Sequence, residues 1–81
     1  MSIVEYAEFL VKSIAKEKDL VKVTSFGGDE DVTIIEIIVC KDDMGAIIGK
    51  EGKMANSLRT LIQAFAYLNG NKKVKINIDS F

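Results

Sequence analysis

Gly49 and Gly52 stand three residues apart and enclose Lys50 and Glu51, and Lys53 follows directly. A backbone can approach a ligand closely at a glycine, because no Cβ intervenes and conformations that other residues avoid are open to it. If a helix begins just after the second glycine, its unpaired N–H groups favour a phosphate at the same place. The two lysines add mobile positive charge there. The chemistry that this segment indicates is binding of an anionic backbone, with no bond broken.

The residue types that most catalytic and zinc sites require are missing. The chain has no His and a single cysteine, Cys40, which excludes an intramolecular disulfide and a set of soft metal ligands. Cys40 ends an apolar strand and is expected to be a buried or half-buried thiol. A phosphate-handling enzyme would need a carboxylate pair such as Asp42 and Asp43, but these are better explained as a helix cap. We therefore expect no enzyme activity, no metal and no cofactor.

Length and composition predict one globular domain, residues 1–81. The chain is 48% hydrophobic and 28% charged and has no Pro, which is typical of a folded domain of this length. No run approaches the roughly 18 apolar residues of a membrane span, and the N-terminus lacks the pattern of a signal peptide. We expect a cytoplasmic protein without a membrane segment.

Charge is distributed unevenly along the chain. The net charge is −1, which argues against coating of nucleic acid through bulk electrostatics. Residues 1–40 contribute −4 and residues 41–81 contribute +3. The glycine pair therefore lies in the basic half of the chain.

The first half of the chain predicts a helix and two strands. Apolar spacing indicates a helix over residues 2–16, with Ser2 as N-cap and Glu5 completing a capping box. A short strand is expected over residues 20–26, followed by a turn at residues 27–31. The segment Val32–Val39 is so continuously apolar that it should be the middle or most buried strand of its sheet.

The second half predicts two helices and a strand. Asp42 or Asp43 caps a short helix at Met44–Ile48, which ends at Gly49, and a longer helix runs from Gly52 or Lys53 to about Leu68. The inner face of the long helix is expected to hold Met54, Leu58, Leu61, Ile62 and Phe65. Residues 69–71 end that helix, and residues 74–78 alternate as a strand with one wet face. The order α-β-β-α-α-β predicts an α+β fold, with helices on one face of a three-stranded mixed sheet containing a parallel pair.

The glycine segment between the two helices resembles the signature of the KH domain, whose Gly-x-x-Gly loop clamps about four backbone nucleotides of single-stranded nucleic acid. The resemblance is carried by the sequence Ile47-Ile48-Gly49-Lys50-Glu51-Gly52-Lys53. A helix and a strand before the β-α-α-β unit are typical of the type II KH fold. Nearly the whole chain is similar to the small stand-alone bacterial KH proteins of the KhpA family, most clearly at residues 41–53 and 57–62.

This resemblance implies binding of single-stranded RNA in the cytoplasm, as a post-transcriptional regulator or RNA chaperone. By the same resemblance, the loop Gly49, Lys50, Glu51 and Gly52 grips the sugar-phosphate backbone, Lys53 and Arg59 add phosphate contacts, and Ile47 and Ile48 form the groove floor or the core beneath it. Bases would lie on an aliphatic groove walled by the two helices and the buried strand. Because Glu51 puts a negative charge inside the clamp, we expect weak, salt-sensitive binding.

These residues also have plainer interpretations. Lys50 and Lys53 could be solvated surface lysines, Arg59 could make an i, i+3 or i+4 contact along its helix, and one of Ile47 and Ile48 is expected to be fully buried.

Partner proteins are a second expectation from this sequence. The long helix is apolar nearly all round at residues 61–68, so we hypothesise a homodimer contact on its outer face, centred on Ala64, Tyr67 or Leu68. The family resemblance likewise implies self-association, or pairing with the larger KH protein KhpB, also called Jag, in processes touching cell shape, elongation and division. A module of KH fold that mainly docks a protein is therefore the rival hypothesis to RNA binding.

Overall fold

The structure, a computed structural model, describes residues 1–27, 32–70 and 73–81. Its helices and strands are α1 (Ile3–Ile14), β1 (Lys22–Gly27), β2 (Val32–Val39), α2 (Met44–Ile48), α3 (Lys53–Leu68) and β3 (Lys73–Ser80), with short 3-10 turns η1 (Lys18–Leu20), η2 (Lys41–Asp43) and η3 (Lys50–Gly52). The predicted order α-β-β-α-α-β is confirmed. Most of the turn expected at residues 27–31, and residue 71 of the expected helix stop, lie outside the described residues.

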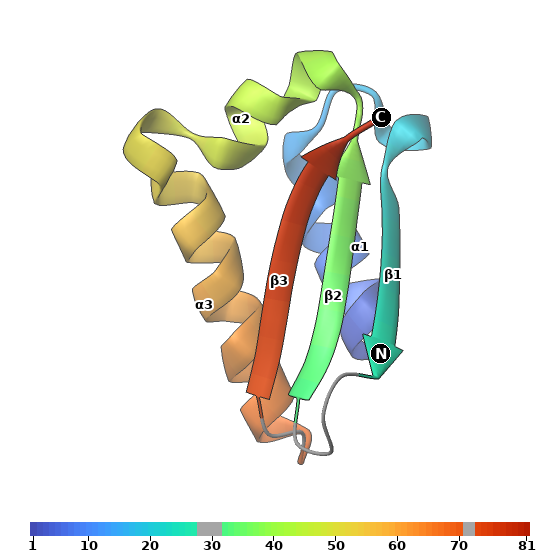
Figure 1. Ribbon diagram of the computed structural model, residues 1–81, viewed down its shortest axis with the longest axis vertical. Coiled ribbons are helices and arrows are strands. Elements are labelled where there is room, and N and C mark those ends of the chain that lie inside the picture. Colours follow the sequence, from blue (N-terminus) through green and yellow to red (C-terminus); the bar gives the residue numbers. More distant parts are fainter. Residues whose placement is uncertain (28–31, 71–72) are drawn as a thin grey trace.

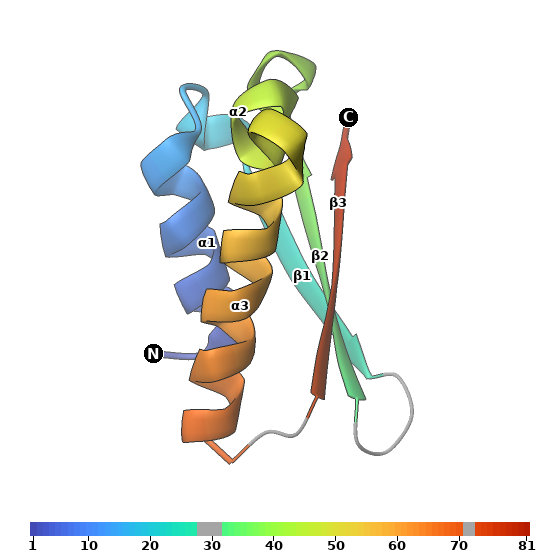
Figure 2. The ribbon, with the colours of Figure 1, turned by 90° about the vertical axis from the view of Figure 1, so that its left-hand side faces the viewer.

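The three strands form one mixed sheet in the order β1-β2-β3. β1 pairs antiparallel with β2, and β2 pairs parallel with β3. A parallel pair needs a long crossover, and here the crossover consists of α2 and α3. Helices α1 and α3 lie side by side against one face of this sheet (Figures 1 and 2). The predicted α+β architecture, with β2 in the middle and the helices on one face, is confirmed.

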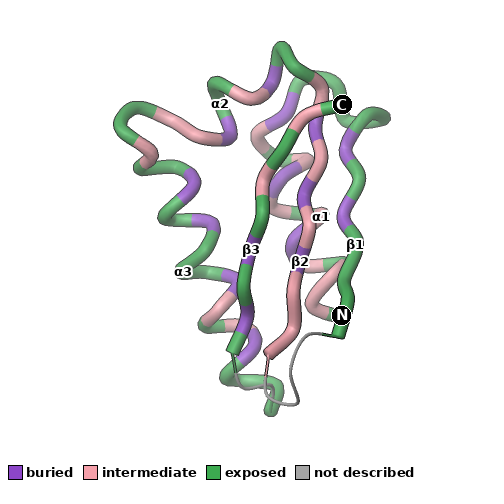
Figure 3. Tube along the Cα trace, viewed as in Figure 1, coloured by how far each residue is buried: buried purple, intermediate pink, exposed green. Residues whose placement is uncertain are grey.

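The core lies between the helices and the covered face of the sheet (Figure 3). Its largest fully buried side chains are Ile35, Ile37, Ile47, Leu58, Ile62, Val11 and Val39. Along β2 the buried positions alternate with partly exposed ones, although the sequence of this strand is apolar almost throughout. The reason is that helices cover only one face, so Ile34 and Ile38 on the other face remain partly exposed.

The start of the chain follows the prediction closely. Ser2 Oγ accepts a hydrogen bond from the Glu5 N–H at 3.1 Å, and Glu5 Oε1 accepts one from the Ser2 N–H at 2.8 Å. The expected capping box is thus confirmed. The first strand begins later than predicted, at Lys22, because Leu20 lies in the η1 turn. None of the helices in the described ranges is long and apolar enough to cross a membrane.

Asp43, one of the two predicted cap residues, stands at the N-cap position of α2, but its carboxylate does not perform the capping role. Its side chain makes no cap hydrogen bond to α2 and is only 3% exposed. Oδ1 accepts from the Lys16 N–H and Oδ2 from the Glu17 N–H, both at 3.0 Å, and the Cys40 thiol donates to Oδ2 at 3.3 Å. Asp43 therefore connects the chain after α1 to the start of α2 through hydrogen bonds. Because its two carboxylate oxygens accept these bonds, Asp43 does not form the carboxylate pair with Asp42 that an enzyme would need.

The inner face of α3 is narrower than predicted. Its buried residues are Ala55, Leu58, Ile62 and Ala66. Met54 and Leu61 were expected inside, but they are 37% and 46% exposed, so that part of the prediction is wrong. The small side chains of Ala55 and Ala66 let α3 pack closely against the rest of the core. The larger side chains of Met54 and Leu61 therefore lie outside this contact. Phe65 is partly buried and stacks on Tyr6 of α1, with the ring centroids 4.5 Å apart.

Candidate nucleic-acid interface

The loop between α2 and α3 depends on both of its glycines. Gly49 has φ 76° and ψ 176°, and Gly52 has φ 75° and ψ 11°. Both conformations have a positive φ, which side-chain-bearing residues rarely adopt. At Gly49 there is also no room, because an added Cβ would lie 2.6 Å from the Cβ of Met54 and 2.8 Å from its backbone N. Nothing lies within 4 Å of a Cβ added at Gly52, so there the backbone conformation alone favours glycine.

Three charged side chains surround this loop, and all are exposed: Lys50, Glu51 and Lys53. Glu51 has φ 57° and ψ 26° and is the one non-glycine residue with positive φ in the described chain. A left-handed glutamate costs about 1 kcal/mol relative to an ordinary conformation, so the loop holds a strained residue between its glycines. Lys53 begins α3, whose N-cap Gly52 supplies no side chain to pair the N–H groups of the first turn. The Lys53 N–H is already bonded to the Lys50 carbonyl oxygen within η3. An anion would therefore be attracted here by the positive end of the α3 dipole and by the two lysines.

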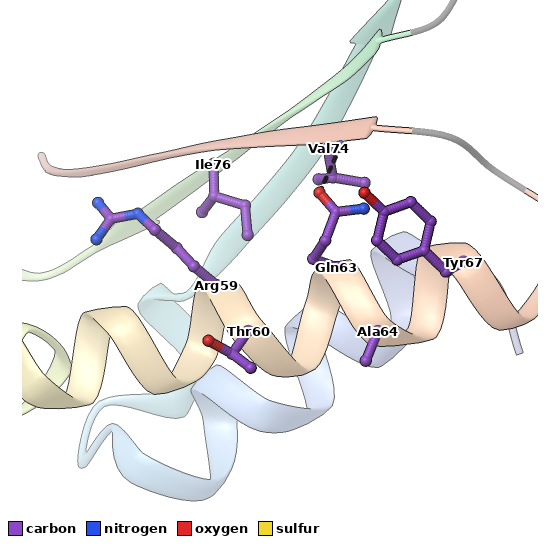
Figure 4. A pocket seen from close by; sticks show the side chains of 7 residues that line it. All are labelled: Arg59, Thr60, Gln63, Ala64, Tyr67, Val74 and Ile76. Carbon is purple, nitrogen blue, oxygen red and sulfur yellow. Dashed lines mark hydrogen bonds between the residues drawn. The ribbon is translucent and has the colours of Figure 1, made fainter.

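A groove of about 500 Å³ follows α3 away from the loop. It runs between α3 and the edge strand β3 (Figure 4). Its lining residues are Arg59, Thr60, Gln63, Ala64 and Tyr67 from the helix, and Val74 and Ile76 from the strand. The groove lining contains one charged residue, Arg59, and no carboxylate. An apolar floor next to an isolated cation suits a flat ligand that carries negative charge at its edge.

Gln63 connects the two walls of this groove. Its Oε1 accepts a hydrogen bond from the Val74 N–H at 2.9 Å. Figure 4 shows Arg59, Gln63 and Tyr67 extending from α3 toward β3, with Val74 and Ile76 facing them. The side chain of Gln63 thereby supplies an acceptor to a backbone donor of an edge strand, and it fixes the spacing between helix and strand at that point.

The structure brings most of the predicted site residues to one side of the molecule. Gly49, Lys50, Glu51, Gly52 and Lys53 form the loop and the first residue of α3. Arg59 lies farther along the same helix, where it lines the groove and its Nη1 donates to Asn56 Oδ1 at 3.3 Å. Arg59 therefore makes the predicted i, i+3 contact along its helix and also lines the groove.

Ile47 and Ile48 have separate positions. Ile47 is fully buried in the core, as expected for one of the pair, and Ile48 is partly buried at the end of α2. Neither lines the groove, whose apolar floor comes from Val74 and Ile76. The strand that walls the groove is the edge strand β3, and not the buried strand β2 that the resemblance led us to expect.

Sequence reasoning missed the far part of the groove. Gln63, Val74 and Ile76 were not singled out, and Tyr67 was considered only as a dimer contact. A signal was present, since Arg59, Gln63 and Tyr67 recur every four residues and so share one side of a helix. What the sequence does not show is which strand lies opposite that side.

The fold and the loop together define a type II KH domain, in which a helix and a strand precede the strand-helix-helix-strand unit. The chain belongs to the KhpA/KhpB family of KH domains: the family described as "KhpA/KhpB, KH domain" matches residues 4–78. The predicted family is thereby confirmed. This is a non-catalytic family, which agrees with the expectation that the chain is not an enzyme.

Several relatives by sequence carry the name RNA-binding protein KhpA. The protein from Borreliella burgdorferi is 39% identical over 75 residues, which cover 93% of this chain and 89% of the relative. The protein from Caldanaerobacter subterraneus subsp. tengcongensis is 42% identical over 73 residues, covering 85% of this chain and 95% of the relative.

The fold is also similar to part of the protein Era. A crystal structure of Era in complex with MgGDPNP and nucleotides 1506–1542 of 16S ribosomal RNA matches with a TM-score of 0.69. The match covers 98% of this chain but only 30% of the Era chain, at 18% sequence identity. At this identity the likeness concerns the fold alone.

Proposed function

We propose that this protein binds single-stranded RNA, with the sugar-phosphate backbone held at the Gly49–Gly52 loop and the bases lying over the groove between α3 and β3. The observation that carries the proposal is the succession of these two features along one helix. A loop with two positive-φ glycines precedes α3, and the following turns of α3 line an apolar groove that contains no carboxylate. The names of the relatives support RNA as the ligand.

Each part of the proposed site matches a part of the ligand. Phosphates suit the loop, where the positive end of the α3 dipole and the exposed Lys50 and Lys53 provide positive charge. Bases suit the floor made by Val74 and Ile76, because their unstacked faces are apolar. A duplex keeps those faces stacked, so the groove favours a single strand. Arg59 is positioned to contact a phosphate or a base edge beside this floor.

The binding should be weak and sensitive to salt. Three cations, Lys50, Lys53 and Arg59, are the proposed phosphate contacts, whereas Glu51 opposes them. For a single strand, three contacts predict that the logarithm of the association constant falls with the logarithm of salt concentration with a slope of about −2.

Fluorescence anisotropy with a pool of short single-stranded RNAs tests the proposal. The informative variant carries Lys50→Asp and Glu51→Asp, which retains both glycines, and its matched control carries Glu51→Asp alone. The variant and its control differ only at position 50, where a lysine becomes an aspartate. We expect the wild type and the control to bind with the predicted salt dependence, and the double variant to lose binding while its circular dichroism spectrum stays unchanged.

Equal binding by all three folded proteins would contradict the clamp, and absence of binding by the folded wild type would contradict RNA as the ligand. In either case the second candidate function gains support, namely docking of a protein.

A specific observation favours docking of a protein as well. Leu61 and Leu68 on α3 are 46% and 85% exposed and do not line the groove. Of the three residues predicted to centre a homodimer contact, Ala64 and Tyr67 line the groove and Leu68 does not.

For this second candidate we propose a homodimer, or a pair with a KhpB-type KH protein, formed through Leu61 and Leu68. Analytical ultracentrifugation at high micromolar concentration should show a dimer that Leu68→Glu disrupts, whereas Lys75→Glu on the exposed side of β3 should leave it intact. A strict monomer would remove the homodimer.

The cellular role that fits RNA binding by this domain is that of a cytoplasmic post-transcriptional regulator or RNA chaperone. Faster annealing of two complementary RNAs in the presence of the wild type, but not of the double loop variant, would support the chaperone role.

A further inference from the structure

We infer that Tyr67 is a stacking platform for one base at the end of the groove that lies farthest from the glycine loop. This inference rests on the proposed function and adds a binding residue to it. Tyr67 is the one aromatic residue among those that line the groove, and its side chain extends toward β3 beside Gln63 and Val74 (Figure 4). It is 63% exposed, so most of its surface is accessible to a ligand.

The surroundings of the ring favour a flat apolar ligand. Val74, which faces it from β3, is buried, and its N–H is already bonded to Gln63 Oε1 at 2.9 Å. A base that reaches this point therefore meets hydrocarbon on the floor and a π-face on the wall, and does not meet an open backbone donor there. Any of the four bases can stack on an aromatic ring, because every base has a π-face. The contact adds affinity and little sequence preference.

The position of Tyr67 sets the length of RNA that can use it. The rise of an α-helix, about 1.5 Å per residue, places Tyr67 about 21 Å along α3 from Lys53, which begins the helix at the loop. A strand with a stacked spacing of roughly 3.4 Å needs about six spacings, or about seven nucleotides, to cover that length, and an extended strand needs fewer. RNA held at the loop thus reaches the ring only above a minimum length.

A length series measures this contribution. Fluorescein-labelled oligouridylates of about three to nine nucleotides are titrated with the wild type and with Tyr67→Ala. The affinity of the wild type should rise stepwise near the length that reaches the ring, and Tyr67→Ala should lack that step. At longer lengths the variant should bind roughly fivefold more weakly or worse, the lower end of what one base-aromatic stack contributes.

Two further variants separate stacking from other effects. Phe9→Ala removes an exposed aromatic side chain of α1 that does not line the groove, and should bind all lengths like the wild type. Tyr67→Phe retains the ring and should keep the step. Intrinsic tyrosine fluorescence gives a direct readout: RNA that reaches the ring should quench the wild type, and the quenching should disappear in Tyr67→Phe, where Tyr6 remains as the only tyrosine.

The outcomes distinguish this inference from the function on which it rests. If the wild type binds none of the RNAs, both are overturned. If the wild type and a folded Tyr67→Ala bind every length equally, RNA binding stands and the stacking platform is overturned. Equal losses in Tyr67→Ala and Phe9→Ala would also overturn it, because the effect would then not come from the groove.

Discussion

A Cβ at position 49 would lie 2.6 Å from the Cβ of Met54, which belongs to the first turn of α3. The backbone at Gly49 therefore approaches the start of α3 so closely that a side chain has no room. The loop is thus packed directly against α3, and the absence of a side chain at Gly49 sets how closely the two approach. The proposed phosphate site consequently has a defined shape before any ligand arrives.

Replacement of Gly49 by alanine should destabilise the protein strongly. The new Cβ would meet both the side chain and the backbone of Met54, in a conformation that only glycine adopts easily, so we expect a loss of about 2 kcal/mol or more in the free energy of unfolding. Urea denaturation measures it. Gly45→Ala is the matched control, because nothing lies within 4 Å of its added Cβ inside α2, and it should be neutral or gain roughly 0.5–1 kcal/mol. Similar midpoints for both variants would contradict the packing described.

Replacement of Glu51 should separate the strain of the loop from its charge. Glu51→Asn suits the left-handed conformation and should gain up to about 1 kcal/mol of stability, whereas Glu51→Gln keeps the shape of the side chain and should gain little. Both variants remove a negative charge from the clamp, so both should bind RNA more tightly than the wild type at low salt. If neither change alters affinity, Glu51 does not lie near the bound phosphates.

Asp43 should make stability depend on pH in the acid range. Hydrogen bonds from the N–H groups of Glu17 and Lys16 hold the pKa of this carboxyl below its usual value of 3.8. Just below that value the unfolded chain binds more protons than the folded one. The stabilising contribution of Asp43 is therefore complete above about pH 4 and is lost as the pH falls through the folded pKa.

Denaturation of Asp43→Asn at a series of pH values checks this behaviour. The variant should be less stable than the wild type at pH 7, because an amide cannot accept from both N–H groups through two oxygens. Its stability should also fall less steeply between about pH 4 and pH 2. Asp42→Asn, at the exposed neighbouring position, should follow the wild-type curve. Parallel curves for all three proteins would show that the carboxylate of Asp43 does not stabilise the fold.

Cys40 should react slowly with iodoacetamide at neutral pH. Burial raises the pKa of its thiol, and the hydrogen bond from Sγ to the carboxylate of Asp43 raises it further. Because the thiolate is the reactive form, alkylation should be several-fold slower than at an exposed cysteine and should accelerate only at alkaline pH. Ser57→Cys in a Cys40→Ser background provides that exposed reference. Comparable rates at pH 7 would contradict the described environment.

Local patterns in the sequence predict much of this fold. The spacing of apolar residues indicates α1 and α3, the pair Ser2 and Glu5 indicates the capping box, and the apolar segment Val32–Val39 indicates the central strand. Each of these features is determined by residues that lie close together in the sequence. The glycine loop belongs to the same group, since two glycines and two lysines in seven residues indicate both its conformation and its charge.

Features that depend on distant contacts could not be predicted in this way. Asp43 looks like a helix cap, yet its partners are the N–H groups of Lys16 and Glu17 in another part of the chain. The groove was expected against the buried strand, and only the sheet order β1-β2-β3 makes β3 the strand beside α3. The side chains of Met54 and Leu61 have the helical spacing of core residues, but small alanines occupy the contact instead.

The parallel pairing of β2 with β3 has a consequence for how the protein is made. All of α2, the glycine loop and α3 lie in the crossover between the two strands, so the pairing joins segments that are far apart in the chain. Contacts of this kind form late, because a long loop must close before they stabilise anything. Val74 and Ile76 enter the groove only with the last strand. During synthesis on the ribosome, the growing chain therefore has no groove until β3 has emerged, and the proposed RNA site is incomplete until that point.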